Sequence, residues 1–253
     1  SLGYAATLGG RYCYRTINGG RTWGPAGCGP IERSQVSPIK IFSPNLAYCG
    51  SVVFGSRFFY FNRSVDTMHT WQTISQLSSP TGFPPDFRLF FLSKDTIVAC
   101  GGVPPLIIDE WTGTIECHKS TNGGLTWGFP FVDTLAPSSV VSFGSKSVGY
   151  AFSSLLGGSY VHYKTHKTTN AGASWFQIPT TIDTSSDMQV TDAYFKNPRE
   201  GFVSGGGLAH TVDGGLTWTR IPGVSGEYMS MSWFDSLHGW AAGGGGKIYR
   251  TTT

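Results

Sequence analysis

The chain has 253 residues, a formal net charge of +3 and only 13% charged residues, while glycine occurs 35 times and aromatic residues make up 14%. This low charge is not typical of a nucleic-acid-binding protein, and no apolar run is long enough to cross a membrane as a helix. The abundance of Gly, Pro, Thr, Ser, Val and aromatic residues favours short strands joined by turns, so we expect an all-β fold.

One eight-residue pattern, Thr-x-Asn/Asp-Gly-Gly-x-Thr-Trp, recurs along the chain, and we call each copy a box. The boxes are TINGGRTW (16–23), SVDTMHTW (64–71), STNGGLTW (120–127), TTNAGASW (168–175) and TVDGGLTW (211–218), and a sixth begins as YRTTT at Tyr249 with Thr253 in the Asn/Asp place. Their tryptophans, Trp23, Trp71, Trp127, Trp175 and Trp218, are 48, 56, 48 and 43 residues apart. Such a period is typical of propeller blades.

The residue types of the box suit a tight hairpin. The Asn or Asp side chain accepts hydrogen bonds from nearby backbone N–H groups, and glycine permits positive φ. The tryptophan supplies apolar surface to bury between blades. We therefore assign a structural role to the tryptophans and to Asn18, Asp66, Asn122, Asn170 and Asp213. Because Met68 and Ala171 replace box glycines, we expect looser turns, or turns of another type, in the second and fourth copies.

Two strand-like segments precede each box. The first segments end in an aromatic residue, at Phe42, Phe91, Phe143, Phe195 and Phe234, and the second are AYCG (47–50), TIVACG (96–101), GYAF (149–152), GFVSG (201–205) and GWAAGG (239–244). With the strand that enters each box and the strand that follows it, each unit is a four-stranded antiparallel meander. The first unit lacks its first strand and the last unit lacks its fourth, which gives 22 strands.

We therefore predict a six-bladed β-propeller of four-stranded antiparallel blades, incomplete at its first and last blades. The prediction is one domain, residues 1–253, with blades at about 1–32, 33–78, 79–136, 137–184, 185–224 and 225–253. A segment of roughly 20 residues upstream of Ser1 would supply the two missing strands and remove open sheet edges. We accordingly expect the chain to be a piece of a longer polypeptide.

These repeats resemble the Asp-box, or bacterial neuraminidase repeat, β-propellers. Within them they are most similar to the photosystem II assembly factor-like group, whose repeats read G-aromatic-A-x-G followed by [KR]-T-T-D-G-G-x-T-W. The resemblance covers essentially the whole chain and implies the propeller fold. The superfamily includes sialidases, xyloglucan hydrolases, sortilin-type receptors and non-catalytic scaffolds, so the fold does not choose the function.

The cysteines allow two cross-strand disulfides. Cys13 and Cys28 lie on either side of the first box hairpin, and Cys100 and Cys117 flank the loop between the second and third strands of the third blade. Both pairs fit the close Cβ approach of a cross-strand disulfide, and Cys49 would be left over. The alternative is five reduced, buried thiols. Together with a polar, uncharged surface composition, the cysteines favour an extracellular or cell-surface protein.

A basic residue precedes the first Ser or Thr of nearly every box: Arg15, Arg63, Lys119, Lys167 and Arg250, with His210 in the fifth. One such residue per blade would make a ring that binds anions. The interpretation that we favour is local, with each residue paired to a box carboxylate or stacked on an aromatic ring, because residues repeated in every blade usually serve the blade.

Insertions around the third blade are the predicted binding region, since function in repeat folds tends to lie in insertions on one face. The insertions 75–87 and 101–116 should emerge on the face opposite the box turns, together with the turn 153–165. The candidate binding residues there are Phe83, Asp86, Arg88, Asp109, Glu110, Trp111, Tyr160 and His162. Aromatic rings beside carboxylates suit recognition of a carbohydrate or a peptide.

Enzyme signatures are weak. The Arg-Ile-Pro sequence of sialidases occurs only after the fifth box, at 220–222, and Asp109 and Glu110 would point to opposite sides of an extended chain. His162 and His166 would be about 13 Å apart on a strand, so we predict no metal site and no cofactor.

We therefore expect a non-catalytic binding or scaffold propeller of a secreted or cell-surface assembly. Its partner would be a protein or a glycan, bound through the loop face around the third blade, without nucleic acid or membrane insertion. The first alternative is a carbohydrate-active domain, either lectin-like or a glycoside hydrolase. The second is a chaperone similar to photosystem assembly factors.

Overall fold

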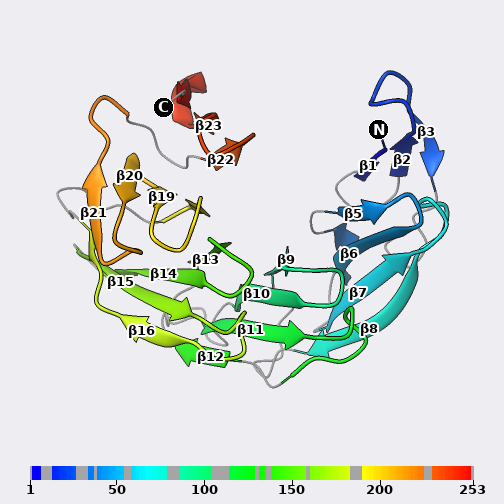
Figure 1. The fold of residues 1–253 in the computed structure, drawn as a ribbon, viewed down its shortest axis with the longest axis horizontal. Helices are drawn as coiled ribbons and strands as arrows, with labels where there is room; N and C mark the ends of the chain where they lie inside the picture. Colours follow the sequence, from blue (N-terminus) through cyan, green and yellow to red (C-terminus); the bar gives the residue numbers. More distant parts are fainter. Residues whose placement is uncertain are drawn as a thin grey trace. The chain divides into compact units, whose positions relative to one another are not determined.

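The computed structural model describes residues 2–6, 13–26, 34–36, 39–53, 58–78, 86–103, 114–128, 131–134, 138–157, 160–182, 190–224 and 230–251. The chain divides into two compact units. Unit 1 comprises Ser1–Leu106 and Glu116–Pro130, and unit 2 comprises Ile107–Ile115 and Phe131–Thr253. The described residues form six sheets, antiparallel except for one short parallel strand in the fifth, and a single short 3₁₀ turn (Figure 1). These sheets are the blades of a six-bladed β-propeller, as the repeat predicts.

The first three sheets follow the order of the chain. The first is β1 (Gly3–Ala6), β2 (Cys13–Thr16) and β3 (Gly24–Ala26). The second is β5 (Lys40–Ser43), β6 (Leu46–Val53), β7 (Phe58–Ser64) and β8 (Gln72–Ser78), with β4 (Ser34–Val36) paired to the far end of β6. The third has the order β12-β11-β10-β9, from β9 (Asp86–Phe91), β10 (Ile97–Val103), β11 (Thr114–Ser120) and β12 (Phe131–Thr134).

The last three sheets belong to unit 2. The fourth is β13 (Ser138–Phe143), β14 (Gly149–Gly157), β15 (Tyr160–Thr168) and β16 (Phe176–Ile178). The fifth is β18 (Asp192–Phe195), β19 (Gly201–Ser204), β20 (Leu208–Thr211) and β21 (Thr217–Arg220), with β17 (Thr181–Ile182) parallel to β21. The sixth is β22 (Ser230–Trp233), β23 (Gly239–Ala242) and β24 (Ile248–Thr251), with the 3₁₀ turn η2 (Gly244–Gly246) before β24.

The described residues contain 24 strands, two more than the sequence predicts. The additional strands are β4 and β17. The eight-residue strand β6 is long enough to pair with β5 at one end and with β4 at the other. The strand β17 forms because the chain leaving β16 runs beside the fifth box, where the Thr181 N–H donates to the carbonyl of Leu216 at 2.9 Å.

In the fourth, fifth and sixth sheets, an aromatic ring at the end of the first strand packs on a glycine that begins the second. Phe143 pairs with Gly149, Phe195 with Gly201, and in the sixth sheet Trp233 pairs with Gly239. A Cβ on Gly149 would lie 2.6 Å from the Phe143 ring, so only glycine fits. The prediction that Phe234 is the strand-end aromatic of the sixth blade was therefore wrong by one residue.

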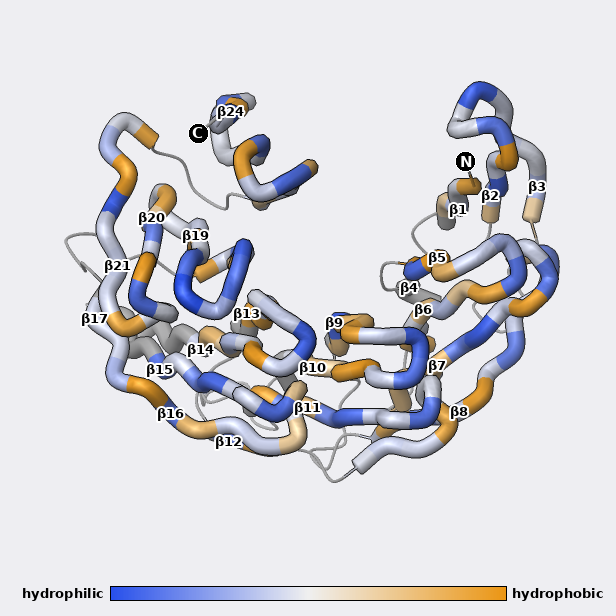
Figure 2. The backbone as a smooth tube through the Cα atoms, in the orientation of Figure 1, coloured by the Kyte–Doolittle hydropathy of each residue, from blue (hydrophilic) through white to orange (hydrophobic). Residues whose placement is uncertain are grey.

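Each unit is held together by aromatic packing between neighbouring sheets. In unit 1, Tyr48 of the second sheet stacks on Phe91 of the third with ring centroids 5.8 Å apart, and Trp127 meets Phe61 edge-on at 5.4 Å. In unit 2, Tyr150 and Phe195 stack at 3.9 Å. Hydrophobic and hydrophilic positions are interspersed along the strands (Figure 2). Each fully buried ring of this size contributes about 1.5–3 kcal/mol.

Candidate functional site

The box turns share one hydrogen-bond pattern. In the fifth box, Asp213 Oδ1 accepts from the Thr217 N–H at 3.0 Å, and the Thr211 hydroxyl accepts from the Gly215 N–H at 3.0 Å. The equivalent bonds occur at Asn18, Asp66, Asn122 and Asn170. Burial by itself would raise the pKa of the Asp213 carboxyl. Hydrogen bonds, led by that from the Thr217 hydroxyl, outweigh burial and lower this pKa to about 2. The box carboxylates are thus engaged within their own turns.

The second and fourth turns keep the conformation of the others. Thr67, Met68 and Ala171 have φ of 58°, 61° and 58°, the left-handed region that glycine occupies in the other copies. The expectation of looser or different turns was therefore wrong. The hydrogen bonds of Asp66 and Asn170 hold these L-residues in a conformation that costs roughly 1–2 kcal/mol each.

Three box tryptophans, Trp71, Trp175 and Trp218, are buried, while Trp127 is half-buried. Trp23 of the first box is 47% exposed. The buried ring of Trp218 lies against Phe152 and Phe195 at 5.8 and 6.0 Å, so it fills the space between the fourth and fifth sheets. Among the described residues, the tryptophan of a box therefore packs toward the sheet that precedes it in the chain.

Several of the basic residues before the boxes lie beside an aromatic residue of the neighbouring strand. Tyr4 pairs with Arg15, Tyr48 with Arg63, Tyr150 with Lys167, Phe202 with His210 and Trp240 with Arg250. Lys167 Nζ lies 5.2 Å from the Tyr150 ring centroid, and the Arg250 guanidinium lies 5.8 Å from that of Trp240. At Lys167, His210 and Arg250 the local stacking interpretation holds.

The predicted binding residues of the loop face are only partly visible. Phe83, Asp109, Glu110 and Trp111 lie outside the described residues. Asp86 and Arg88 are on β9, and Arg88 is exposed, while Tyr160 and His162 are on β15. The structure describes the side chains of Asp86, Tyr160 and His162 no further. Binding through this face stays a prediction.

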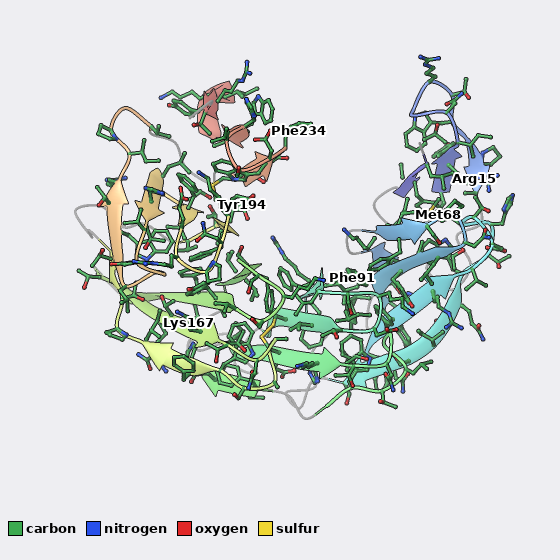
Figure 3. The ribbon with its side chains drawn as sticks, viewed as in Figure 1. Arg15, Met68, Phe91, Lys167, Tyr194 and Phe234 are labelled. Carbon is green, nitrogen blue, oxygen red and sulfur yellow. A yellow bond between two sulfur atoms is a disulfide. The ribbon has the colours of Figure 1, made fainter. Side chains whose placement is uncertain are left out.

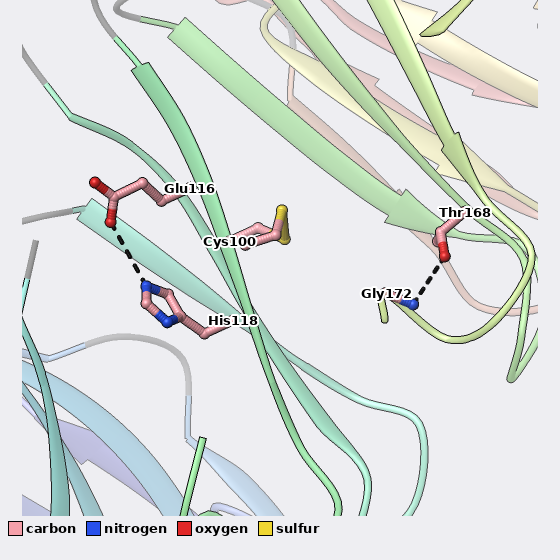
Figure 4. Close-up of a disulfide and its surroundings, with 6 residues drawn as sticks. Cys100, Glu116, His118, Thr168 and Gly172 are labelled. Atoms are coloured by element: carbon pink, nitrogen blue, oxygen red, sulfur yellow. Dashed lines mark hydrogen bonds and ion pairs between the residues drawn. A yellow bond between two sulfur atoms is a disulfide. The ribbon is translucent and has the colours of Figure 1, made fainter. Parts of the chain in front are cut away.

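The structure contains the disulfide Cys100–Cys117, which joins β10 to β11 (Figure 4). Cys13 is also disulfide-bonded, and its predicted partner Cys28 lies outside the described residues. Cys49 is a free, buried thiol, and burial raises its pKa.

A buried ion pair near the disulfide was not predicted. Glu116 and His118 on β11 lie 3.5 Å apart and are both buried (Figure 4). The Phe87 ring meets His118 edge-on at 5.2 Å. Alternation along the strand places both side chains on one face of β11, and this i, i+2 spacing was the available signal in the sequence. Because both side chains are enclosed by the core, we assign the pair a structural role rather than a role in ligand binding.

A groove with a volume of about 570 Å³ lies between the fifth and sixth sheets, within unit 2. Its floor is apolar and includes Leu208, Ile221 and Met231, while Phe202, Trp233 and Trp240 supply aromatic surface. Its volume falls in the range of about 300–1,000 Å³ that is typical of ligand sites. Tyr194 stacks on Trp233 at 4.7 Å and fixes this ring at the edge of the sixth sheet; Figure 3 marks Tyr194.

The polar side of the groove carries an excess of positive charge. Lys196 Nζ lies 2.9 Å from Glu200 Oε1, and the His210 ring lies 3.3 Å from the same oxygen. The hydrogen bond from Lys196 is the main reason that the pKa of Glu200 is lowered. Arg250 on β24 adds a second cation to the lining. Lys196, Glu200, His210 and Arg250 thus form the polar side of the groove.

The sequence indicated only part of this groove. His210 and Arg250 stood out as residues that precede boxes, whereas Lys196, Glu200 and Trp233 did not. Trp233 could have been found by requiring the aromatic residue to pair with Gly239, since the fourth and fifth sheets pair an aromatic residue with the glycine that begins the second strand.

Metal-ligand clusters and membrane-spanning helices are both absent from the described residues. No three His, Cys, Asp or Glu side chains converge there as ligands for a metal ion. None of the helical structure in these ranges has the length and apolarity needed to cross a bilayer.

No known family profile and no curated protein matches this chain in sequence. Solved structures do match its fold. The GH74 enzyme of Niastella koreensis is 17% identical over 98% of this chain and 41% of its own, with a TM-score of 0.59. The Penicillium chrysogenum alpha-L-arabinanase complexed with arabinobiose is 13% identical over 96% and 84%, with a TM-score of 0.51. YCF48 from Cyanidioschyzon merolae is 18% identical over 99% and 91%, with a TM-score of 0.45. The first two likenesses show a shared β-propeller fold.

Proposed function

We propose that this protein is a non-catalytic binding or scaffold β-propeller that recognises a polypeptide partner through the groove between its fifth and sixth sheets. The observation that carries the proposal is the combination, in one 570 Å³ groove, of an apolar floor, aromatic walls and unequal numbers of cations and carboxylates. Aromatic residues and arginine are enriched where proteins bind one another. The groove is therefore suited to a peptide that carries apolar side chains and an acidic group.

The disulfide supports a location outside the cytosol. Disulfides persist in oxidising compartments and are rare among cytosolic proteins. Cys100–Cys117 therefore favours the secreted or cell-surface assembly proposed above. The predicted loop face around the third sheet stays a separate binding prediction.

The test is a peptide-display selection against the whole chain, followed by measurement of the selected peptides on groove variants. Arg250→Ala and Trp240→Ala should weaken binding by about tenfold or more, because both side chains line the groove. Lys146→Ala, an exposed cation in the turn between β13 and β14, is the matched control and should bind normally. Peptides that bind equally to all variants would contradict the proposal.

One observation favours a glycan as a second candidate. The indole of Trp240 is 40% exposed and lies beside Arg250, an arrangement that can stack on a sugar ring and bind an acidic substituent. A glycan array combined with a reducing-sugar release assay separates the possibilities. Binding abolished by Trp240→Ala would support a lectin-like function, and release of sugar would contradict the non-catalytic proposal.

A further inference from the structure

Neighbouring sheets within each unit are joined by the same arrangement. The box turn of one sheet lies against the second-strand aromatic residue of the sheet before it. In unit 2, a Cβ on Gly214 would be 3.0 Å from the hydroxyl oxygen of Tyr150, and Gly215 also lies beside the Tyr150 ring. In unit 1, Gly123 lies against the hydroxyl of Tyr48 in the same way. The aromatic residue therefore forms the surface on which the following Gly-Gly turn rests.

The cation before each box takes part in this arrangement. Arg15 of the first sheet donates to the carbonyl of Thr67, in the box turn of the second sheet, at 2.9 Å. Lys167 of the fourth sheet has its Nζ 3.5 Å from the position that a Cβ on Gly214 would take, in the box turn of the fifth. These cations thus contact the box turn of the following sheet, a role beyond stacking on their own aromatic partners.

The groove between the fifth and sixth sheets has residues at the same strand positions as those that receive the box turn between the fourth and fifth sheets. Phe202 pairs with His210 as Tyr150 pairs with Lys167. Trp233 is the counterpart of Phe195, since each pairs with the glycine that begins the next strand. The Ile221 N–H donates to the Leu208 carbonyl beside β21. Both residues line the groove, and Ile221 takes the place that Ile178 has beside Gly215 in the preceding interface. The receiving residues for a box turn are therefore present.

We propose that the groove is the binding site for a polypeptide turn of the box type, Gly-Gly-x-Thr-Trp. Its glycines rest on Phe202, its indole packs against Trp233 and Ile221, and His210 faces its backbone carbonyls. This inference rests on the proposed function, because it names the peptide chemistry that the groove recognises. The excess positive charge of the groove favours a box that carries Asp before its glycines, as in residues 211–218, over a box that carries Asn.

The first experiment uses a fluorescein-labelled peptide with the sequence of residues 211–221, TVDGGLTWTRI, titrated with the whole chain and followed by anisotropy. We expect saturable binding that weakens by about tenfold or more when the peptide carries Trp218→Ala, because the indole is the anchor. The protein variant His210→Ala should weaken binding, and Lys146→Ala should not. Equal binding of the Trp and Ala peptides would overturn the inference.

A second experiment avoids the entropic cost of ordering a free peptide. The five residues Gly-Gly-Leu-Thr-Trp are appended after Thr253, because Thr251 pairs with Gly239 as Thr211, the first residue of the fifth box, pairs with Gly201. The tether raises the effective concentration of the turn at the groove. We expect the melting temperature to rise by several degrees above that of a chain ending in Gly-Gly-Leu-Thr-Ala. Equal melting temperatures, together with no preference for the Trp peptide, would refute the inference.

These outcomes separate the two proposals. If display-selected peptides still depend on Arg250 while box peptides do not bind, the groove binds polypeptides of another chemistry and only this inference fails. If no selected peptide responds to groove variants, the proposed function itself fails.

Discussion

The acidic residues of two boxes illustrate how single side chains set the stability of this fold. The Thr70 hydroxyl and backbone hydrogen bonds lower the pKa of Asp66 to about 2, while Asn18, Asn122 and Asn170 make similar bonds without a charge. A carboxylate pKa that is lower in the folded state than in the unfolded chain stabilises the fold above the unfolded pKa of about 4. That contribution is lost as the pH falls from about 4 towards 2.

We predict that the double variant Asp66→Asn, Asp213→Asn melts at nearly the wild-type temperature at pH 7. Asparagine can keep the Oδ1 hydrogen bonds and donate to the Thr hydroxyl, as Asn122 does to Thr126. The loss of stability between pH 4 and pH 2 should become smaller, and melting curves across this range test it. Asp95→Asn, whose exposed side chain pairs with the neighbouring Lys94, is the control. An unchanged acid dependence in the double variant would contradict this account.

A second prediction concerns the left-handed positions of the box. Ala171→Gly should stabilise the protein by about 0.5–1 kcal/mol, because it relieves the strain of positive φ and this gain exceeds the entropic cost of glycine. The reverse change, Gly214→Ala, should destabilise it by about 1–3 kcal/mol, because its Cβ would press on Tyr150 and the Pro198 carbonyl. Denaturant unfolding measures both, and the same sign for both variants would disprove the argument.

At the scale of the elements, the register between strands determines which side chains meet. The sequence predicts the strands well, because the box recurs along the chain and an aromatic residue ends the first strand of most sheets. The groove was harder to predict, since it requires Trp233 rather than Phe234 to face the core. Phe234 is 83% exposed, at the end of β22 (Figure 3). A shift of one residue moves a side chain to the other face of a strand. A one-residue alignment error therefore conceals that Trp233 lines the groove.

The link between β2 and the second box turn gives an element-scale prediction. Arg15→Ala removes the hydrogen bond to the Thr67 carbonyl and should cost about 1 kcal/mol. Hydrogen exchange should accelerate at the amides of Met68 and Thr70, which are bonded within this turn. Arg21→Ala changes an exposed arginine of the first turn and should leave these amides protected. Unchanged exchange in Arg15→Ala would show that the link does not hold the turn.

At the scale of the whole molecule, the number of blades and their order along the chain follow from the repeat alone. The sequence could not settle the oxidation of the cysteines, because oxidation depends on cross-strand geometry as well as spacing. It also missed β4 and β17, because neither repeats between sheets and both depend on neighbouring backbone positions. Non-repeated features are therefore the ones that required coordinates.

The disulfide gives a prediction for global stability. Cys100 and Cys117 are 17 residues apart, and a cross-link closing a loop of this size stabilises a protein by about 3 kcal/mol through the unfolded chain. The double variant Cys100→Ala, Cys117→Ala should therefore unfold at lower denaturant concentration. Cys49→Ala is a control for loss of a buried sulfur, since Cys49 is free. If the double variant is as stable as wild type under oxidising conditions, the bond contributes little.

The short strand β17 has a consequence for the behaviour of the protein in concentrated solution. An outer strand such as β21 exposes backbone donors and acceptors that can pair with a strand of another molecule. Here Thr181 binds the Leu216 carbonyl and the Thr180 hydroxyl binds the Gly215 carbonyl, so part of that outer edge is already occupied. Thr180 and Thr181, which lie outside the repeat, thus reduce the number of backbone groups on this edge that can pair with another molecule during fibre formation.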